Sequence, residues 1–324
     1  MSEKDDISDL ARLSIPGKLD PLSGYDVPVQ GPYYPQPPWL FSEIKLFVYP
    51  FLTHGRDIAK FVPKQLQVPT FILGDLTLGF YFIADFGQSP MGPYRELISA
   101  VLSDNNGALY PYLPYCYPNN GAAMSAGREV GGYPKMMGIV DISYNDPYTF
   151  NVKNANGIEL ISGDLTVGEP LFPLSDDAEH SADNLIRDAH SFLDSGLVNF
   201  IEGAFSSDLG KMIEDIVEYI LGMIDHAVSD TSWPVDARTL QMIAGPGPIL
   251  PDETGYEPSL TRLIKTNYGV KIHKLSLAEG SFKYGTDPAN PLQNLPVVME
   301  LSSLYAECEF TLKPDGVELD YLQP

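Results

Sequence analysis

Short runs of β-branched and aromatic residues, bounded by turn residues, recur along much of the chain. The runs IKLFVYPF, FILGDLTLGFYFIADF and KTNYGVKIHKLSLAEGSFKYG are typical of strands, because these side chains fit the half-buried surface of a pleated sheet. Alternation on both sides of Asn156-Gly157 predicts a hairpin or meander. Between the first two runs, HGRDIAKFVPKQL is typical of a short helix that ends before Pro63. The pattern therefore predicts a body rich in strands.

Two segments interrupt this pattern. Residues 1–38 are polar and then rich in Pro and Tyr, which predicts an extended N-terminal arm because proline fixes φ and blocks a helix. In residues 175–232, apolar residues such as Met212 and Ile216 recur at helical spacing. This spacing predicts a helical insertion whose apolar stripes pack on the core or on another subunit, and we expect a homo-oligomer. Residues 39–324 are expected to form a single domain that contains the insertion.

The charge balance narrows the range of partners. The chain of 324 residues has 20 Lys and Arg residues against 43 Asp and Glu residues, which gives a formal net charge of −23. A chain this acidic is poorly suited to nucleic acid or to anionic membranes, because binding to either depends on lysine and arginine. Apolar residues make up 44% of the chain, which is enough for a large core. We therefore expect a partner that is neither nucleic acid nor membrane.

The first residues, the cysteines and the histidines give no sign of a secreted, disulfide-linked or metal-binding protein. The start, MSEKDDISDL, lacks the apolar stretch of a secretory signal, and no apolar run is long enough for a membrane-spanning helix. Cys116 and Cys308 are expected to be buried, unreactive thiols. None of the five histidines has the spacing of metal ligands, so no metal site is expected. These features fit a cytoplasmic location.

One segment, GREVGGYPKMMG (residues 127–138), places a lysine in apolar surroundings. Lys135 lies between a tight Gly-Tyr-Pro turn and two methionines that lead into an apolar strand. Burial would disfavour the charged ammonium group and lower the pKa of this lysine. A neutral lysine amine can attack a carbonyl carbon and form a Schiff base. Taken alone, the same pattern also fits a structural lysine whose charged end reaches water.

The same segment resembles the GRE-x-x-x-YPKK-type motif of the acetoacetate decarboxylase superfamily. GPYRE (residues 92–96), NPLQNLPV (residues 290–297) and the closing GVELDYL (residues 316–322) are similar to three further family segments in the same order. The resemblance implies an α+β, mainly antiparallel fold with a closed or cone-like β-barrel around a pocket, and with the helical insertion outside it. It also implies an enzyme without a metal or organic cofactor, in which a lysine iminium acts as the electron sink.

Carried over to this chain, the resemblance assigns expected roles to four residues. Lys135 matches the Schiff-base nucleophile. Glu96 matches a glutamate of the active site, which would act as a general acid or base or orient the substrate. Arg128 and Glu129 match the arginine–glutamate pair that precedes the lysine. We expect this pair to order the loop that presents Lys135, by hydrogen bonding and ion pairing.

Three departures from the family pattern bear on the substrate. Met136 replaces the second lysine of the motif, so burial rather than a neighbouring cation would have to tune Lys135, and a methionine supports burial. The substrate-binding arginine of the family aligns with Ser42, and its other active-site glutamate aligns near Gly79. Without the arginine, a small anion such as acetoacetate lacks a charge-assisted binding partner. A larger, less polar carbonyl compound is therefore expected.

Three functions remain open on the sequence. The first is a lyase, of decarboxylase or aldolase-dehydratase type, that acts on a keto acid or a larger carbonyl metabolite through a Schiff base at Lys135. The second is a cyclase or dehydratase of secondary metabolism that uses Glu96, with Tyr94 and Tyr133 as candidate hydrogen-bond donors to a carbonyl oxygen. The third is a non-catalytic protein that binds an apolar ligand.

Overall fold

The computed structural model describes residues 30–64, 66–70, 75–105, 108–170, 242–246 and 262–320. The predicted helical insertion at residues 175–232 lies outside the described residues, and so do residues 1–29 of the predicted arm. No helix in the described part of the chain is long and apolar enough to cross a membrane.

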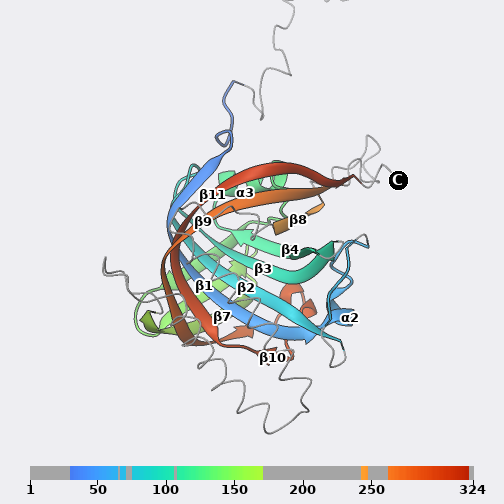
Figure 1. Ribbon diagram of the computed structural model, residues 1–324. Coiled ribbons are helices and arrows are strands. Elements are labelled where there is room, and N and C mark those ends of the chain that lie inside the picture. The colour runs from blue at the N-terminus through green and yellow to red at the C-terminus, as the bar shows by residue number, and fades with distance from the viewer. Residues whose placement is uncertain are drawn as a thin grey trace, which may run out of the picture.

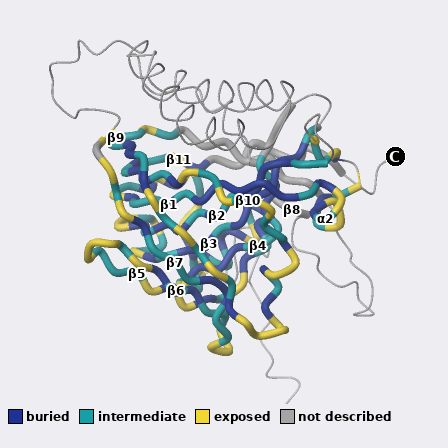
Figure 2. The backbone as a smooth tube through the Cα atoms, turned by 90° about the horizontal axis from the view of Figure 1, so that it is seen from below, coloured by how far each residue is buried: buried dark blue, intermediate teal, exposed yellow. Residues whose placement is uncertain are grey.

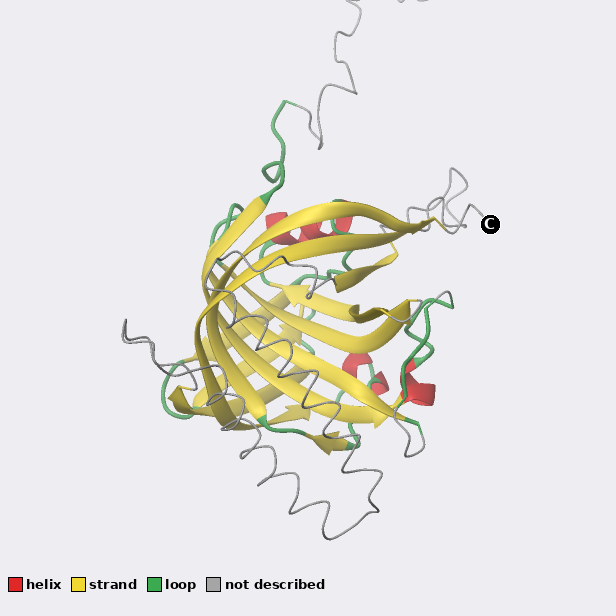
Figure 3. Ribbon diagram, viewed as in Figure 1, coloured by secondary structure: helices red, strands yellow, loops and turns green. Residues whose placement is uncertain are grey.

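Strands make up most of the described chain, and helices are few and short (Figure 3). In chain order, the strands are β1 (Trp39–His54), β2 (Leu76–Gln88), β3 (Tyr94–Asn105), β4 (Ala108–Pro118), β5 (Gly138–Ser143), β6 (Tyr148–Asn154), β7 (Glu159–Pro170), β8 (Met242–Pro246), β9 (Arg262–Tyr284), β10 (Met299–Glu300) and β11 (Ser303–Asp320). The helices are α2 (Gly55–Ile58), α3 (Gly121–Glu129) and the short 3-10 helix η3 (Pro291–Asn294).

The strands form one strongly curved, mostly antiparallel sheet (Figure 1). β1 pairs with β2, β2 with β3 and β3 with β4, and β4 meets β8 in a parallel pair. β8 pairs with β9, and β11 pairs with both β9 and β1. These pairs lead back to the first strand, so the sheet curves around an interior. The mainly antiparallel, barrel-like fold expected from the sequence is confirmed.

Alternation of side chains along the strands gives this sheet two apolar faces, because successive residues of a strand point to opposite sides. On β1, Tyr49 and Phe51 belong to a core that β5, β6 and β7 also build. Trp39 and Phe41, on the same strand, belong to a second cluster shared with β2, β3, β11 and α3. Exposed positions gather at turns, including the hairpin that joins β6 to β7 (Figure 2). The second cluster faces the interior of the curved sheet.

A bulge in β1 decides which of its residues face that interior. The register with β11 shifts between Phe41 and Ile44, and Glu43 has a φ of 53°. An extra residue in one strand re-aims the side chains on either side of it. As a result, Phe41 and Ile44 both line the interior cavity although they are three positions apart, a spacing that puts side chains on opposite faces of a regular strand.

Two helices differ from the expectation based on sequence. The helix predicted in HGRDIAKFVPKQL is limited to Gly55–Ile58 and continues only as turns. The second is α3, which lies in the body of the protein where the sequence pattern predicts mainly strands. The Asn120 side chain accounts for this helix, because its oxygen accepts a hydrogen bond from the N–H of Ala123 at 2.9 Å and so caps the first turn. The alanines that follow favour a helix.

Candidate active site

Hydrogen bonds hold the backbone around Lys135, which lies between α3 and β5. Its N–H donates to the carbonyl oxygen of Tyr133 at 2.8 Å. The N–H of Met136 donates to the carbonyl oxygen of Cys116 on β4 at 2.9 Å. Arg128, in the last turn of α3, donates from Nη1 to the carbonyl oxygen of Lys135 at 2.9 Å. The lysine backbone is therefore fixed to both α3 and β4.

The side chain of Lys135 forms a buried ion pair with Glu96 of β3. Nζ lies 2.8 Å from Oε2, and the exposed fraction is 8% for Lys135 and 1% for Glu96. The other carboxyl oxygen, Oε1, is buried without a hydrogen-bond partner. Burial raises the pKa of the Glu96 carboxyl group above its ordinary value, although the neighbouring ammonium group opposes this rise. The pair thus joins a buried amine to a carboxyl group that can hold a proton.

The lysine side chain passes directly over Gly127 of α3. A Cβ atom at this position would lie 2.5 Å from Cε and 2.6 Å from Cδ of Lys135. These separations are far shorter than the roughly 3.5 to 4.0 Å at which carbon atoms pack. A glycine is therefore needed for the lysine to reach Glu96 in this way. No role for Gly127 was expected from the sequence, where its only signal is its place at the start of the GRE motif.

The ion pair lies in the wall of an apolar cavity of about 280 Å³. The described part of this wall comes from α3 and from strands β1, β2, β3, β4, β9 and β11, and large apolar side chains dominate it, among them Phe41, Ile44, Phe82, Phe86 and Phe310. Among the described lining residues, only Lys135 and Glu96 carry a formal charge. In such surroundings little water competes for the hydrogen bonds of the pair.

Tyr94 and Tyr133 line the same cavity beside the lysine. Their ring centres lie 5.8 and 5.7 Å from Lys135 Nζ, respectively. Tyr94 also stacks on Phe86, with 4.4 Å between the ring centres. Burial, together with the nearby carboxylate of Glu96, raises the pKa of Tyr94 well above its ordinary value. Its hydroxyl group therefore stays protonated and can donate a hydrogen bond.

Cys116 and Cys308 line the cavity as free, buried thiols. Burial raises the pKa of both, that of Cys308 to about 12. The thiols therefore remain protonated, and their burial is as expected from the sequence. Within the described ranges, no cluster of three or more His, Cys, Asp or Glu residues is arranged to hold a metal ion.

Glu129 and Met136 do not lie where the sequence suggests. Glu129 is exposed, and its Oε2 accepts a hydrogen bond from Tyr34 Oη at 2.7 Å. It therefore ties the segment before β1 to α3, whereas a role in ordering the loop of Lys135 was expected. Met136 is 38% exposed and does not line the cavity, so it does not help to bury the lysine. Lys135 faces inward, and its neighbour in this extended segment consequently faces solvent.

Comparison with known proteins decides the family. The family model for acetoacetate decarboxylase matches residues 26–192, slightly more than half of the 324 residues. The chain belongs to the acetoacetate decarboxylase family. It is 30% identical over 101 residues to Decarboxylase DEC1 of Cochliobolus heterostrophus, a match that covers 31% of this chain and 38% of that protein. It is 29% identical over 121 residues to the acetoacetate decarboxylase of Clostridium acetobutylicum, which covers 37% and 48% of the two chains. The chain thus matches less than half the length of these curated relatives.

Solved structures of acetoacetate decarboxylases and of a related enzyme share the fold. A structure of acetoacetate decarboxylase matches with a TM-score of 0.61 at 19% identity, covering 93% of this chain and 98% of the other. The acetoacetate decarboxylase of Legionella pneumophila also gives 0.61, at 14% identity, and covers 95% and 100%. The enduracididine biosynthesis enzyme MppR gives a TM-score of 0.59 at 13% identity and covers 95% and 99%. At identities this low, the likeness shows the fold alone.

Ser42 and Gly79 were expected to stand where the family has an arginine and a second glutamate, and neither residue lines the cavity. Ser42 is not part of the cavity lining, although its neighbour Phe41 is. Gly79 lies on the opposite face of β2, where an added Cβ atom would meet the ring of Phe51 in the other core. Gly79 is therefore not placed to supply a charged group to the cavity.

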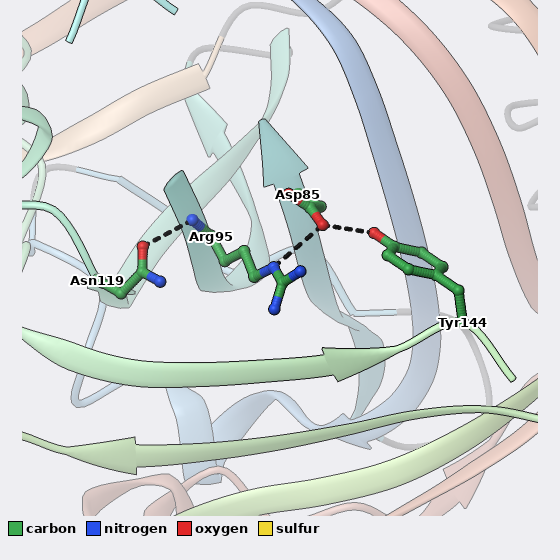
Figure 4. Close-up of polar contacts among 4 residues, drawn as sticks. All are labelled: Asp85, Arg95, Asn119 and Tyr144. Atoms are coloured by element: carbon green, nitrogen blue, oxygen red, sulfur yellow. Dashed lines mark hydrogen bonds and ion pairs between the residues drawn. The ribbon is translucent and has the colours of Figure 1, made fainter. Parts of the chain in front are cut away.

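The arginine next to Glu96 on β3 also points away from the cavity. Arg95 donates from Nε to Asp85 Oδ2 at 3.0 Å, and Tyr144 Oη donates to the same oxygen at 2.6 Å (Figure 4). The backbone N–H of Arg95 donates to Asn119 Oδ1 at 2.7 Å. Because neighbouring residues of a strand alternate between faces, this guanidinium group lies on the face opposite Glu96. It is therefore not available to bind a substrate carboxylate in the cavity.

Proposed function

We propose that the protein is a lyase that acts on a carbonyl compound through an imine with Lys135, most simply as a decarboxylase of a 3-oxo acid. The observation that carries this proposal is the 2.8 Å contact between Lys135 Nζ and Glu96 Oε2 in the wall of an apolar cavity. Membership of the acetoacetate decarboxylase family supports the same chemistry.

The first steps join the lysine to the substrate. A proton passes from the ammonium group of Lys135 to Glu96 along their hydrogen bond, which leaves a neutral amine. The nitrogen lone pair attacks the carbonyl carbon and forms a carbinolamine. Its C–O bond breaks as water leaves, and this water carries one proton from the nitrogen and one from the Glu96 carboxyl group. The product is an iminium cation beside an ionised Glu96.

The iminium cation then acts as the electron sink. In a 3-oxo acid, the electron pair of the bond to the carboxylate carbon moves toward the nitrogen, and carbon dioxide leaves. The resulting enamine takes up a proton at carbon, and water hydrolyses the imine to release a ketone and the free lysine. Glu96 is suited to the proton transfers, because it lines the cavity and its Oε1 has no partner.

Borohydride trapping tests this proposal. A ketone should form an imine that borohydride reduces to a stable secondary amine, and peptide mass mapping should find the added mass at Lys135. Lys135→Ala should abolish the label, whereas Lys153→Ala, which changes a lysine on β6, should leave it unchanged. If the folded protein acquires no label at Lys135 with any ketone, the imine mechanism is excluded.

A reaction without an imine is the second candidate. The unpartnered Oε1 of Glu96 and the protonated hydroxyl group of Tyr94 favour it, because the two groups could transfer protons in a cyclisation or a dehydration. Full turnover by Lys135→Ala, together with loss of turnover in Glu96→Gln, would support this reaction over the first.

A further inference from the structure

The cavity wall extends well beyond the Lys135–Glu96 pair. In the cross-strand register, Glu96 lies beside Ala84, and Ala84 lies beside Leu46 of β1. From Leu46, the lining of the cavity continues along β1 as far as Trp39, seven residues earlier in the chain. At ~3.3 Å per residue, this wall is roughly 20 Å long.

The strands next to β1 continue the same wall. Phe310 of β11 lies beside Phe41, and Leu312 lies beside Trp39. Val270 of β9 lies beside Phe310. All five side chains line the cavity, and the rings of Phe41 and Phe310 are 4.7 Å apart. The surface that leads from the ion pair toward Trp39 is therefore continuous and apolar.

The charges in the cavity do not favour a short anionic substrate. Among the lining residues that the structure describes, Lys135 is the one cation, and Glu96 already pairs with it. A carboxylate in such an apolar cavity needs a cation and hydrogen-bond donors to offset the cost of removing it from water. An apolar chain, in contrast, gains binding free energy with each methylene that it buries.

We propose that the substrate is a carbonyl compound with an uncharged, apolar chain that runs from the Lys135–Glu96 pair along β1, β11 and β9 toward Trp39. This inference rests on the proposed imine chemistry and adds the class of substrate. In binding along this wall, the apolar chain of the substrate positions the carbonyl carbon of the substrate against Lys135 Nζ. Binding energy from a part of the substrate that does not react thus takes over the task of an arginine that binds the carboxylate.

Trapping with a series of methyl ketones measures the chain preference without knowledge of the natural substrate. From acetone to 2-heptanone, the concentration that gives half-maximal labelling of Lys135 should fall about fourfold for each added methylene. The matched anion is 6-oxoheptanoate, which has the length of 2-heptanone and ends in a carboxylate. It should label about tenfold less well than 2-heptanone, because its charge would have to be buried.

The outcomes separate this inference from the proposed function. Lys135 could be labelled equally well by ketones of every length, or best by acetone or 6-oxoheptanoate. Either result would refute the proposal that the substrate has an apolar chain, while the imine chemistry would stand. If no ketone labels Lys135, both proposals fail.

A variant at the end of the cavity wall that is distant from Lys135 tests the direction in which the apolar chain of the substrate runs. Val270→Trp fills the cavity near Phe310 and should weaken labelling by 2-undecanone roughly tenfold or more, while labelling by acetone stays within about twofold. The control is Lys271→Trp, at the next residue of β9, whose side chain is 52% exposed. It should not change labelling by either ketone. An equal effect of Val270→Trp on both ketones would refute the proposed direction.

Discussion

At the scale of single residues, Gly127 helps to position the amine of Lys135, because the missing side chain leaves room for the lysine to reach Glu96. In Gly127→Ala, the new Cβ atom would lie 2.5 Å from Lys135 Cε, so the lysine must move away from Glu96. Imine labelling should fall about tenfold or more, because small displacements of reacting groups cost large factors in rate. Overpacking of this kind costs about 1–3 kcal/mol, so the protein should still fold. Trapping with 2-heptanone and thermal unfolding measure the two effects.

The control for this variant lies on the same helix. Ser125 does not line the cavity, and Ser125→Ala should leave labelling unchanged. If Gly127→Ala also labels at the wild-type rate, the lysine does not depend on the space above this glycine, and the role assigned to Gly127 is wrong.

The outward direction of Met136 gives a second prediction at this scale. The family motif has a lysine at this position, but here the side chain is 38% exposed and lies outside the cavity. A charge added there would be screened by water, so Met136→Lys should change the rate of imine labelling by no more than about twofold. Met136→Gln is the uncharged control. A large increase in labelling at neutral pH, seen with lysine and not with glutamine, would show that residue 136 acts on Lys135.

At the scale of elements, α3 supports the lysine. Asn120 caps this helix through the N–H of Ala123, and its Nδ2 donates to the carbonyl oxygen of Met91 at 3.1 Å. Asn120→Ala should lower the free energy of unfolding by about 1 kcal/mol. It should also slow imine labelling, because the end of α3 carries Gly127 and Arg128. Urea unfolding and trapping measure the two effects.

The matched variant keeps the cap. Asn120→Asp retains a side-chain oxygen that accepts from the first turn, and it should recover most of the lost stability. If both variants are equally unstable, the contact with Met91, and not the cap, stabilises this region.

The elements also show what the sequence could predict. Runs of β-branched and aromatic residues predicted the strands. The resemblance of two separate motifs to family segments identified Lys135 and Glu96 as candidate site residues. The 2.8 Å contact between them could not be predicted, because it depends on how β3 and α3 pack. The bulge at Glu43 depends on pairing between strands, which a local pattern does not contain. The outward direction of the Met136 side chain could not be predicted either, because it depends on the hydrogen bond from the N–H of Met136 to the carbonyl oxygen of Cys116 on β4.

At the scale of the whole molecule, the curved sheet has the cavity with the Lys135–Glu96 pair on one face and a row of charged side chains on the other. On the face opposite the cavity, residues of alternating charge are cross-strand neighbours over five strands, in the order Lys274, Glu307, Lys45, Asp85 and Arg95. Opposite charges on neighbouring strands stabilise a sheet. Arg95 and Glu96 are consecutive residues of β3, so this strand contributes one charged side chain to the charge row and the next to the cavity. We therefore expect changes in the charge row to alter stability and to leave the chemistry intact.

Asp85 is the residue of this row that best tests the separation. It accepts hydrogen bonds from Arg95 and Tyr144, so Asp85→Ala leaves two partly buried donors without their partner. The free energy of unfolding should fall by about 2 kcal/mol, while imine labelling of the folded protein stays within about twofold. Combined with Gly127→Ala, the two losses of stability should add, because the sites share no contact. A coupling larger than about 0.5 kcal/mol in this double-mutant cycle would mean that the two faces of the sheet do not act independently.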